Sequence, residues 1–397
     1  MKTNFVKLRW LFTMLLFVTT MIMPTMMLAK SIDLKIPEGD GAGTPYKIGT
    51  AEELYWFAGL VNGTLPGVKK DLSANAILTD DIIVNTGVLD PNKDLVSGND
   101  FIEWIPIGKS SSDDDAYTGT FDGNGHTISG LYFNKSNSWY VGLFGCIGAE
   151  GKISNVGVSD SYFQSSNCPY IGGVCGSNSG ELQNCSNSST VIGKENEYRI
   201  GGVCGYNSGT VKDCKNTGSV RGKETIGGVC GHSYGTIKSC YNTASVSGQY
   251  SVGGVSGSLG SDVTNCYYLS GTVADGKSGI GGQKDENGKA EKMSLEQFKS
   301  GEVAWLLNGS KSVSTEESTL AWYQKLGENA DAYPVLKSTD HNTVYKAPLF
   351  SCDGTTRIGE YANKPEGDKL SHNYQMAEKA DEGTSNLYSE ECAICHN

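Results

Sequence analysis

Apolar and small residues recur in a fixed order along the middle of the chain. Three segments read Ile-Gly-Gly-Val-Cys-Gly and a fourth reads Val-Gly-Gly-Val-Ser-Gly: residues 171–176, 200–205, 226–231 and 252–257. Their Cys or Ser stands at positions 175, 204, 230 and 256, which are 29, 26 and 26 residues apart. A second column of cysteines, at positions 185, 214, 240 and 266, keeps the same spacing. Such self-similarity predicts a repeat architecture in which each repeat is one structural unit.

Further apolar columns lie within each repeat and predict its strands. One column contains Leu182, Val211, Ile237 and Val263, and another contains Val191, Val220 and Val246. Each repeat therefore predicts three short strands separated by turns, and it is too small to bury its own apolar face. The repeats must stack as the coils of a parallel β-helix (β-solenoid), with equal residues about 4.8 Å apart in successive coils. The fold class is all-β.

Polar residues at the turns fit the same stacking. Asn187, Asn216 and Asn242 each follow the second cysteine column by two residues. Stacked Asn side chains can hydrogen-bond along the axis of such a fold. We therefore interpret these Asn residues as corner residues rather than as ligand contacts.

Two short amphipathic helices flank the repeats. Residues 50–53, Thr-Ala-Glu-Glu, form a capping box before an apolar stretch that ends at Asn62-Gly63. Residues 294–297, Ser-Leu-Glu-Gln, form a second capping box before another apolar stretch. An open β end exposes unpaired backbone groups, so we expect a short capping helix at each end of the solenoid.

The chain begins with a segment typical of export signals. Lys2, Lys7 and Arg9 precede an uncharged run that extends to Ala29. Cleavage or retention as a membrane anchor stays open, and so does whether the chain, ending at residue 397, is a fragment. The predicted layout is a signal peptide at 1–29, a linker at 30–44, an N-terminal helical cap at 45–72, the β-helix at 73–279, a C-terminal cap at 280–348 and a small Cys/His tail at 349–397.

The repeat motifs resemble those of the GLUG-motif family, which occurs in bacterial cell-surface proteins and in the non-catalytic part of immunoglobulin-A-cleaving metallopeptidases. Residues 142–145 read Gly-Leu-Phe-Gly, and residues 173–176, Gly-Val-Cys-Gly, are a looser copy. The approach at 104–108 (Trp-Ile-Pro-Ile-Gly) and the exit at 301–308 (Gly-Glu-Val-Ala-Trp-Leu-Leu-Asn) are also similar to that family. The resemblance implies a right-handed β-helix, secreted or on the cell surface, and it implies no single activity.

Charge and motif content exclude several function classes. The formal net charge is −12, and no basic patch is present, so nucleic acid is not an expected partner. None of the five His residues has the His-Glu-x-x-His spacing of a metallopeptidase. Polysaccharide hydrolysis needs paired carboxylates, whereas the repeat columns supply only Asp213, with Lys212 and Lys238 at neighbouring outward positions. We therefore expect no catalytic residues.

Tyrosines on the repeats indicate a binding function. Tyr206, Tyr234 and Tyr241 are predicted to be exposed on a repeated face suited to weak multivalent contact. The predicted function is adhesin-like binding of a glycan or of an extracellular host or matrix protein by a non-enzymatic surface protein. The alternatives are a polysaccharide-degrading β-helix enzyme and a passive stalk that spaces another domain. Membrane anchoring is expected only if the signal segment is retained.

Cysteine is the remaining candidate chemistry. The two cysteine columns are interpreted either as reduced core thiols or as disulfides, which export permits. The tail has little apolar content and contains four residues of the types that bind structural zinc: Cys352, His372, Cys392 and Cys395. Disulfides among the tail cysteines are the alternative. No other cofactor is expected.

Overall fold

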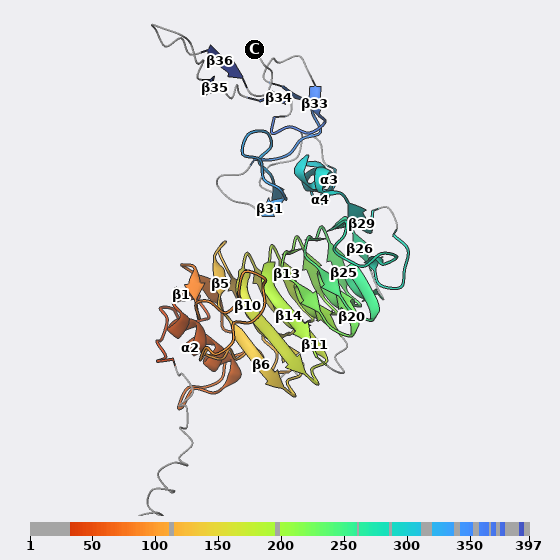
Figure 1. Cartoon of the computed structure of the whole chain (residues 1–397). Coiled ribbons are helices and arrows are strands. Elements are labelled where there is room, and N and C mark those ends of the chain that lie inside the picture. The colour runs from red at the N-terminus through yellow and green to blue at the C-terminus, as the bar shows by residue number, and fades with distance from the viewer. Residues whose placement is uncertain are drawn as a thin grey trace, which may run out of the picture.

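The computed structural model describes residues 32–110, 115–194, 199–259, 262–285, 288–310, 320–336, 342–351, 357–364 and 367–370, together with the backbone of two strands near the C-terminus. Its main body is a right-handed parallel β-helix with three sheets (Figure 1). This architecture confirms the fold predicted from the repeats.

The first sheet has eight parallel strands, one from each successive coil. In order they are β1 (Tyr46–Ile48), β2 (Ala76–Leu78), β4 (Thr120–Asp122), β9 (Lys152–Ser154), β13 (Glu181–Gln183), β17 (Thr210–Lys212), β22 (Thr236–Lys238) and β26 (Val263–Thr264). The register aligns Leu182 with Val211 and Val211 with Ile237, and all three side chains are fully buried. The apolar column read from the sequence is therefore an internal ladder.

The second sheet follows the corner after the second cysteine column. Its main path contains β3 (Ile82–Ile83), β5 (Thr127–Ser129), β10 (Gly157–Ser166), β14 (Ser186–Gly193), β18 (Lys215–Asn216), β23 (Tyr241–Asn242), β27 (Cys266–Leu269) and β29 (Ala290–Met293). The strands β6 (Tyr132–Ser136), β19 (Val220–Arg221) and β24 (Val246–Ser247) extend it beside that path.

The third sheet carries the Ile-Gly-Gly-Val-Cys-Gly segments. Its strands are β7 (Tyr140–Val141), β8 (Phe144–Ile147), β11 (Tyr170–Gly172), β12 (Cys175–Asn178), β15 (Ile200–Gly201), β16 (Cys204–Asn207), β20 (Glu224–Gly227), β21 (Cys230–Ser233), β25 (Tyr250–Leu259) and β28 (Ser278–Ile280). Cys175, Cys204, Cys230 and Ser256 are aligned in register in this sheet.

The cysteine columns are ladders of buried free thiols. All nine cysteines of the described ranges are free and buried. Cys204 Sγ donates a hydrogen bond to the Tyr206 carbonyl at 3.0 Å, and Ser256 Oγ donates to the Ser258 carbonyl at 2.9 Å. Serine can replace cysteine in this column because both side chains supply the donor that satisfies the carbonyl two residues later.

A ladder of side-chain amides runs through the corner beside the second sheet. Asn187 Nδ2 donates to Asn216 Oδ1, and Asn216 Nδ2 donates to Asn242 Oδ1, both at 2.8 Å. These three side chains are at most 1% exposed. The ladder also explains one glycine: a Cβ on Gly202 would lie 2.2 Å from Asn216 Cγ. The corner role predicted for these Asn residues is confirmed.

Helix α2 (Ala51–Asn62) covers the N-terminal end of the solenoid (Figure 1). Thr50 accepts a hydrogen bond from the Glu53 amide, and Gly63 ends the helix in the left-handed conformation, with φ of 63°. The fully buried ring of Phe57 packs against Phe121 of β4, with centroids 6.0 Å apart. Apolar side chains of the helix therefore cover the first coil on the side where no preceding coil exists.

The chain after the solenoid folds back over its corner. Helices α3 (Leu295–Lys299) and α4 (Glu302–Leu307) and the antiparallel strands β30 (Trp322–Tyr323) and β31 (Val335–Leu336) form an apolar cluster with outward-facing residues of the second sheet. Further strands are β32 (Leu349–Phe350), β33 (Arg357–Gly359), β34 (Asp368–Lys369), β35 (Tyr374–Ala377) and β36 (Ser389–Cys392). None of the helices in the described ranges is long and apolar enough to cross a bilayer.

The fold-back corrects one sequence prediction. Tyr241, expected to be exposed, is fully buried, and its hydroxyl donates to the Pro334 carbonyl at 2.6 Å. Its ring packs against Phe298 and Trp322. The prediction was wrong because the side chain does point out of the solenoid but the C-terminal segment covers it.

A loop at residues 86–100 braces the outside of the second sheet. Its Asp94 accepts a hydrogen bond from Arg221 at 2.8 Å, across 127 residues of sequence. The backbone carbonyl of Lys93 in the same loop accepts from Thr190 Oγ1 at 2.6 Å. The loop therefore connects an early coil to β14 and β19.

Candidate functional site

An aromatic stripe runs along the third sheet across successive coils. Tyr140 and Tyr170 are paired in register, and their rings stack at 5.2 Å with an interplanar angle of 7°. Tyr206 and His232 are likewise paired in register and stack at 6.0 Å and 11°. The exposed ring of Tyr234 contacts His232 at 4.6 Å. The stripe therefore consists of two neighbouring columns of the third sheet, and the rings of Tyr170 and Tyr206 meet between them at 5.4 Å with an interplanar angle of 58°.

Arg199 joins the two stacked pairs of the stripe. Its guanidinium carbon lies 5.2 Å from the ring centroid of Tyr170 and 5.6 Å from that of Tyr206. Burial, assisted by the positive charge of Arg199, lowers the pKa of His232. His232 is therefore neutral at pH 7, and its buried Nε2 atom has no hydrogen-bond partner among the described residues. The stripe accordingly presents aromatic faces and one cation.

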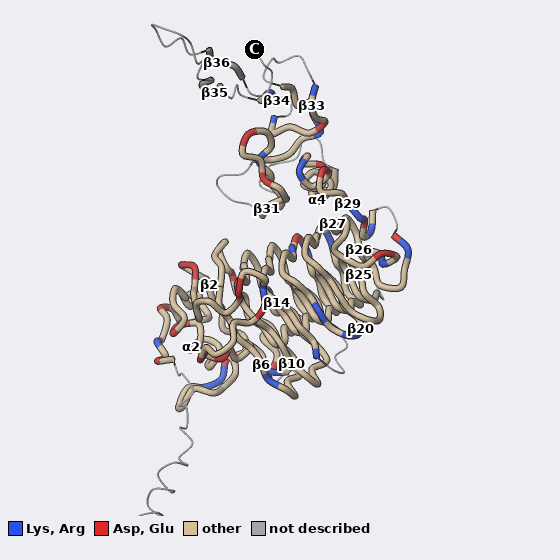
Figure 2. The backbone as a smooth tube through the Cα atoms, viewed as in Figure 1, with Lys and Arg blue, Asp and Glu red and all other residues tan. Residues whose placement is uncertain are grey.

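Two large exposed side chains extend this face. Trp139, directly before the stripe residue Tyr140, is 66% exposed, and Tyr250 of β25 is 60% exposed. Tyr, Trp and Arg are the residue types enriched at binding surfaces and at their energetic hot spots. Figure 2 shows that Lys, Arg, Asp and Glu are sparse along the backbone of the middle coils.

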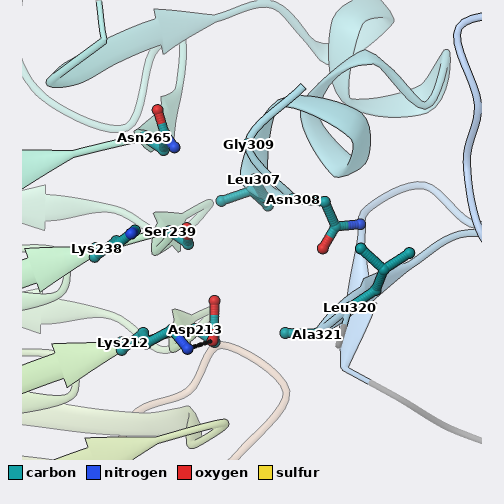
Figure 3. Close-up of a pocket in the computed structure, with 10 residues that line it drawn as sticks. All are labelled: Lys212, Asp213, Lys238, Ser239, Asn265, Leu307, Asn308, Gly309, Leu320 and Ala321. Carbon is teal, nitrogen blue, oxygen red and sulfur yellow. Dashed lines mark ion pairs between the residues drawn. The ribbon is translucent and has the colours of Figure 1, made fainter. Parts of the chain in front are cut away.

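A cleft lies at the corner between the first and second sheets, under the C-terminal segment. One hollow of about 180 Å³ is lined by Lys212, Asp213, Lys238, Ser239 and Asn265 on one side, and by residues 307–309 and 320–321 on the other (Figure 3). A second hollow of about 220 Å³ follows it along the same corner and is lined partly by Lys215 and by β31. Both volumes are below the range usual for drug-sized ligands.

Among the described residues that line these two hollows, Asp213 is the one with a carboxylate side chain. Its side chain is buried, and the Lys212 ammonium lies 3.2 Å from its Oδ2 atom (Figure 3). Burial raises the pKa of Asp213, and the neighbouring lysines oppose the shift only in part. Asp213 has a positive φ of 51°, as do most residues of this corner, including Asn184 with φ of 54°.

The predicted zinc ligands fall outside what the structure describes. Cys352, His372 and Cys395 lie outside the described residues, and for Cys392 only the backbone, in β36, is described. Within the described ranges no group of three or more His, Cys, Asp or Glu residues is arranged to hold a metal ion. The tail site therefore stays a prediction.

Sequence reasoning identified only part of the exposed aromatic surface. Tyr206 is half-buried and Tyr234 is 58% exposed, and both lie on the stripe as expected. Tyr140, Tyr170 and Arg199 were missed, although the spacing contains the signal. Tyr170 and Arg199 each precede a cysteine of the first column by five residues, which places them in one outward column.

Comparison with known proteins identifies the repeat. Residues 196–221 match the family model described as the GLUG motif. The matched segment spans about one repeat of the β-solenoid, whose other coils are aligned with it in register. The matched segment includes Arg199, Cys204, Tyr206 and Asn216, so it contributes residues to both the stripe and the amide ladder.

Two curated relatives match parts of the chain. Halomucin of Haloquadratum walsbyi is 38% identical over 84 residues, 21% of this chain and 1% of halomucin. A protein of Evansella cellulosilytica, provisionally named a Gly-rich membrane protein, is 33% identical over 78 residues, 19% of this chain and 9% of that protein. The chain thus spans less than a tenth of the length of these relatives.

A solved structure of similar size was also found. It is the crystal structure of a Bacteroides ovatus protein provisionally described as an immunoglobulin A1 protease. The match has a TM-score of 0.47 and 18% sequence identity, and it covers 77% of this chain and 95% of that one.

Proposed function

We propose that this protein is an exported surface protein that binds an extracellular glycan or matrix protein through the aromatic stripe of its β-solenoid. The observation that carries the proposal is a pair of neighbouring columns, one with Tyr140, Tyr170 and Arg199 and the other with Tyr206 and His232, joined by ring contact between Tyr170 and Tyr206 and by Arg199. Rigid aromatic rings supply contact area at low entropic cost. A row of similar rings suits a polymeric ligand, because each coil can contribute one weak contact.

A binding role is favoured over catalysis by the composition of the cleft. Glycoside hydrolysis requires two carboxyl groups flanking the scissile bond. The described residues that line the corner hollows include one carboxylate, Asp213, which is buried and paired with Lys212. We therefore propose a non-enzymatic protein, and we expect no release of reducing sugar ends from polysaccharides incubated with it.

Export is supported by the N-terminal sequence and by the relatives. Residues 1–29 have the charge and length pattern of an export signal. One relative is named a membrane protein. We propose that the mature protein is secreted or held at the cell surface, with membrane anchoring only if the signal is retained, and that nucleic acid is not a partner.

The test is a glycan and matrix-protein array probed with the exported chain, followed by affinity measurements on each hit. Tyr170→Ala and Tyr206→Ala remove single rings from the stripe. We expect each to weaken binding by about tenfold or more, because aromatic hot spots contribute about 2 kcal/mol. Tyr132→Ala is the matched control, since Tyr132 stacks on Tyr162 at 6.4 Å in the second sheet, away from the stripe.

The outcomes separate the candidate functions. Loss of binding in the two stripe variants with retention in Tyr132→Ala supports the proposal. Equal affinities for all three variants would place the binding surface elsewhere. No ligand on either array would favour a passive stalk.

A further inference from the structure

An outward column of the second sheet contains Thr127, Gly157, Ser186 and Lys215 in register. All four belong to the lining of the 220 Å³ hollow at the corner, together with Val335 and Leu336 of β31. Gly157 opens space within this column. A Cβ at this position would lie 2.8 Å from Thr127 Oγ1 and 3.2 Å from Ser186 Oγ.

Lys215 is a cation without a counter-charge in contact. Tyr241, the next residue of its column, is fully buried beneath the C-terminal segment, so the lysine stem is enclosed on that side. The Lys215 ammonium forms no hydrogen bond or ion pair with any residue that the structure describes. Burial lowers its pKa, and the more distant Asp331 carboxylate opposes the shift only in part. An ammonium has three donors, and leaving them unpaired in a partly desolvated site is unfavourable.

The hydroxyl groups beside Lys215 also have free hydrogen-bonding capacity. Thr127 Oγ1 and Ser186 Oγ make no hydrogen bonds within the described parts of the chain, and both side chains are half-buried. Each hydroxyl can donate one hydrogen bond and accept another. The hollow therefore combines a cation, two hydroxyl groups and an apolar wall formed by Val335 and Leu336.

We infer that this hollow binds a uronic acid unit of an acidic polysaccharide, with the ligand carboxylate on Lys215 and ligand hydroxyls on Thr127 and Ser186. The apolar wall of β31 is suited to the C–H face of the sugar ring. A site built to hydrogen-bond hydroxyls discriminates strongly against ligands that lack them, which favours a sugar acid over an acidic peptide. The inference is independent of the aromatic stripe, because no stripe residue lines this hollow.

The test is calorimetric titration of the exported full chain with oligogalacturonate and, separately, with an uncharged oligogalactoside of equal length. We expect the acidic oligomer to bind more tightly and its affinity to fall with added salt. Lys215→Met keeps most of the stem and removes the charge. It should weaken oligogalacturonate binding by about tenfold or more, the equivalent of one charge-assisted hydrogen bond.

Two further variants control the experiment. Gly157→Ala fills the gap between the hydroxyls and should also weaken binding, although it changes no charge. Lys152→Met removes an exposed lysine from the neighbouring first sheet and should leave the affinity unchanged. Thermal melts of all variants establish that each is folded.

Three results would overturn the inference. They are equal binding of the charged and uncharged oligomers, wild-type affinity in folded Lys215→Met, and tighter binding of a poly-glutamate peptide than of oligogalacturonate. Stripe variants such as Tyr170→Ala should bind oligogalacturonate at this hollow with wild-type affinity. The experiment therefore distinguishes a failure of the proposed stripe function from a failure of the proposed site at the hollow.

Discussion

The amide ladder gives the most quantitative prediction. Asn216 accepts hydrogen bonds from Asn187 Nδ2 and from the Gly218 amide, and it donates to Asn242 Oδ1 and to the Gly218 carbonyl. Asn242 Oδ1 keeps a second donor, the Ala244 amide at 3.2 Å, when Asn216 is truncated. Asn216→Ala therefore leaves three buried groups unpaired: both backbone groups of Gly218 and one N–H of Asn187 Nδ2, which keeps only its hydrogen bond to the Ser189 carbonyl at 3.5 Å. At about 1 to 3 kcal/mol for each, and allowing for relaxation, the expected loss is about 3 to 6 kcal/mol.

The assay is urea unfolding of the full chain, with the midpoint and slope compared between variants. Thr217→Ala is the neighbouring control. Thr217 is exposed, and the Asn187 carbonyl that accepts from its hydroxyl at 3.4 Å keeps the Thr217 amide at 2.8 Å, so the unfolding free energy should change by no more than about 0.5 kcal/mol. Asn216→Asp should cost more than Asn216→Ala, since it buries a charge and loses both donors. If Asn216→Ala shifts the midpoint no further than Thr217→Ala does, the ladder does not hold the coils together as argued.

Four other predictions concern thiols, charge and the tail. Cys204→Ser should retain the donor to the Tyr206 carbonyl and be about 1 kcal/mol or more less destabilising than Cys204→Ala in the same unfolding assay. The nine buried thiols should resist alkylation in the native protein and react after denaturation, as peptide mass spectrometry would show; modification of the native core thiols would contradict the ladder. Burial raises the pKa of Asp213, so ionising this carboxyl group destabilises the folded state, and the full destabilisation is present only at a pH above the folded-state pKa. Asp213→Asn should therefore stabilise the protein at neutral pH. Thermal melts at a series of pH values should show this gain disappear below about pH 4, where the carboxyl group is protonated in both the folded and the unfolded state. Metal analysis of reduced protein should find about one zinc per chain that is lost in Cys392→Ser, whereas a disulfide at Cys392 and no metal would refute the zinc site.

The regular coils could be predicted from the sequence because each ladder is a local property repeated along the chain. Val211 and the residues aligned with it in the neighbouring coils all face inward, and the sequence shows this as an apolar column. The sequence also shows that Ser256 can replace cysteine in the first column. The reason appears only in the structure, where the Ser256 hydroxyl donates to the carbonyl two residues later.

Contacts between distant segments could not be predicted in this way. The periodic pattern correctly places Tyr241 on the outside of a coil, yet Trp322 and the residues around it cover the ring from more than 80 positions later in the chain. The contact of Arg221 with Asp94 is similarly long-range. Lys215 becomes a candidate ligand site only because the returning segment encloses it, and the repeat pattern contains no information about that segment.

The in-register ladders also make the coil a unit of length. Adjacent coils differ in size, 29 residues from Cys175 to Cys204 and 26 from Cys204 to Cys230, yet every ladder stays aligned because the additional residues fall between Gly193 and Ile200. Gain or loss of one whole coil would join equivalent positions and change the reach of the array by about 4.8 Å. Gain or loss of part of a coil would interrupt the thiol and amide ladders together. Genes for such proteins can therefore be lengthened or shortened by recombination in whole coils, with the surface chemistry of each coil preserved.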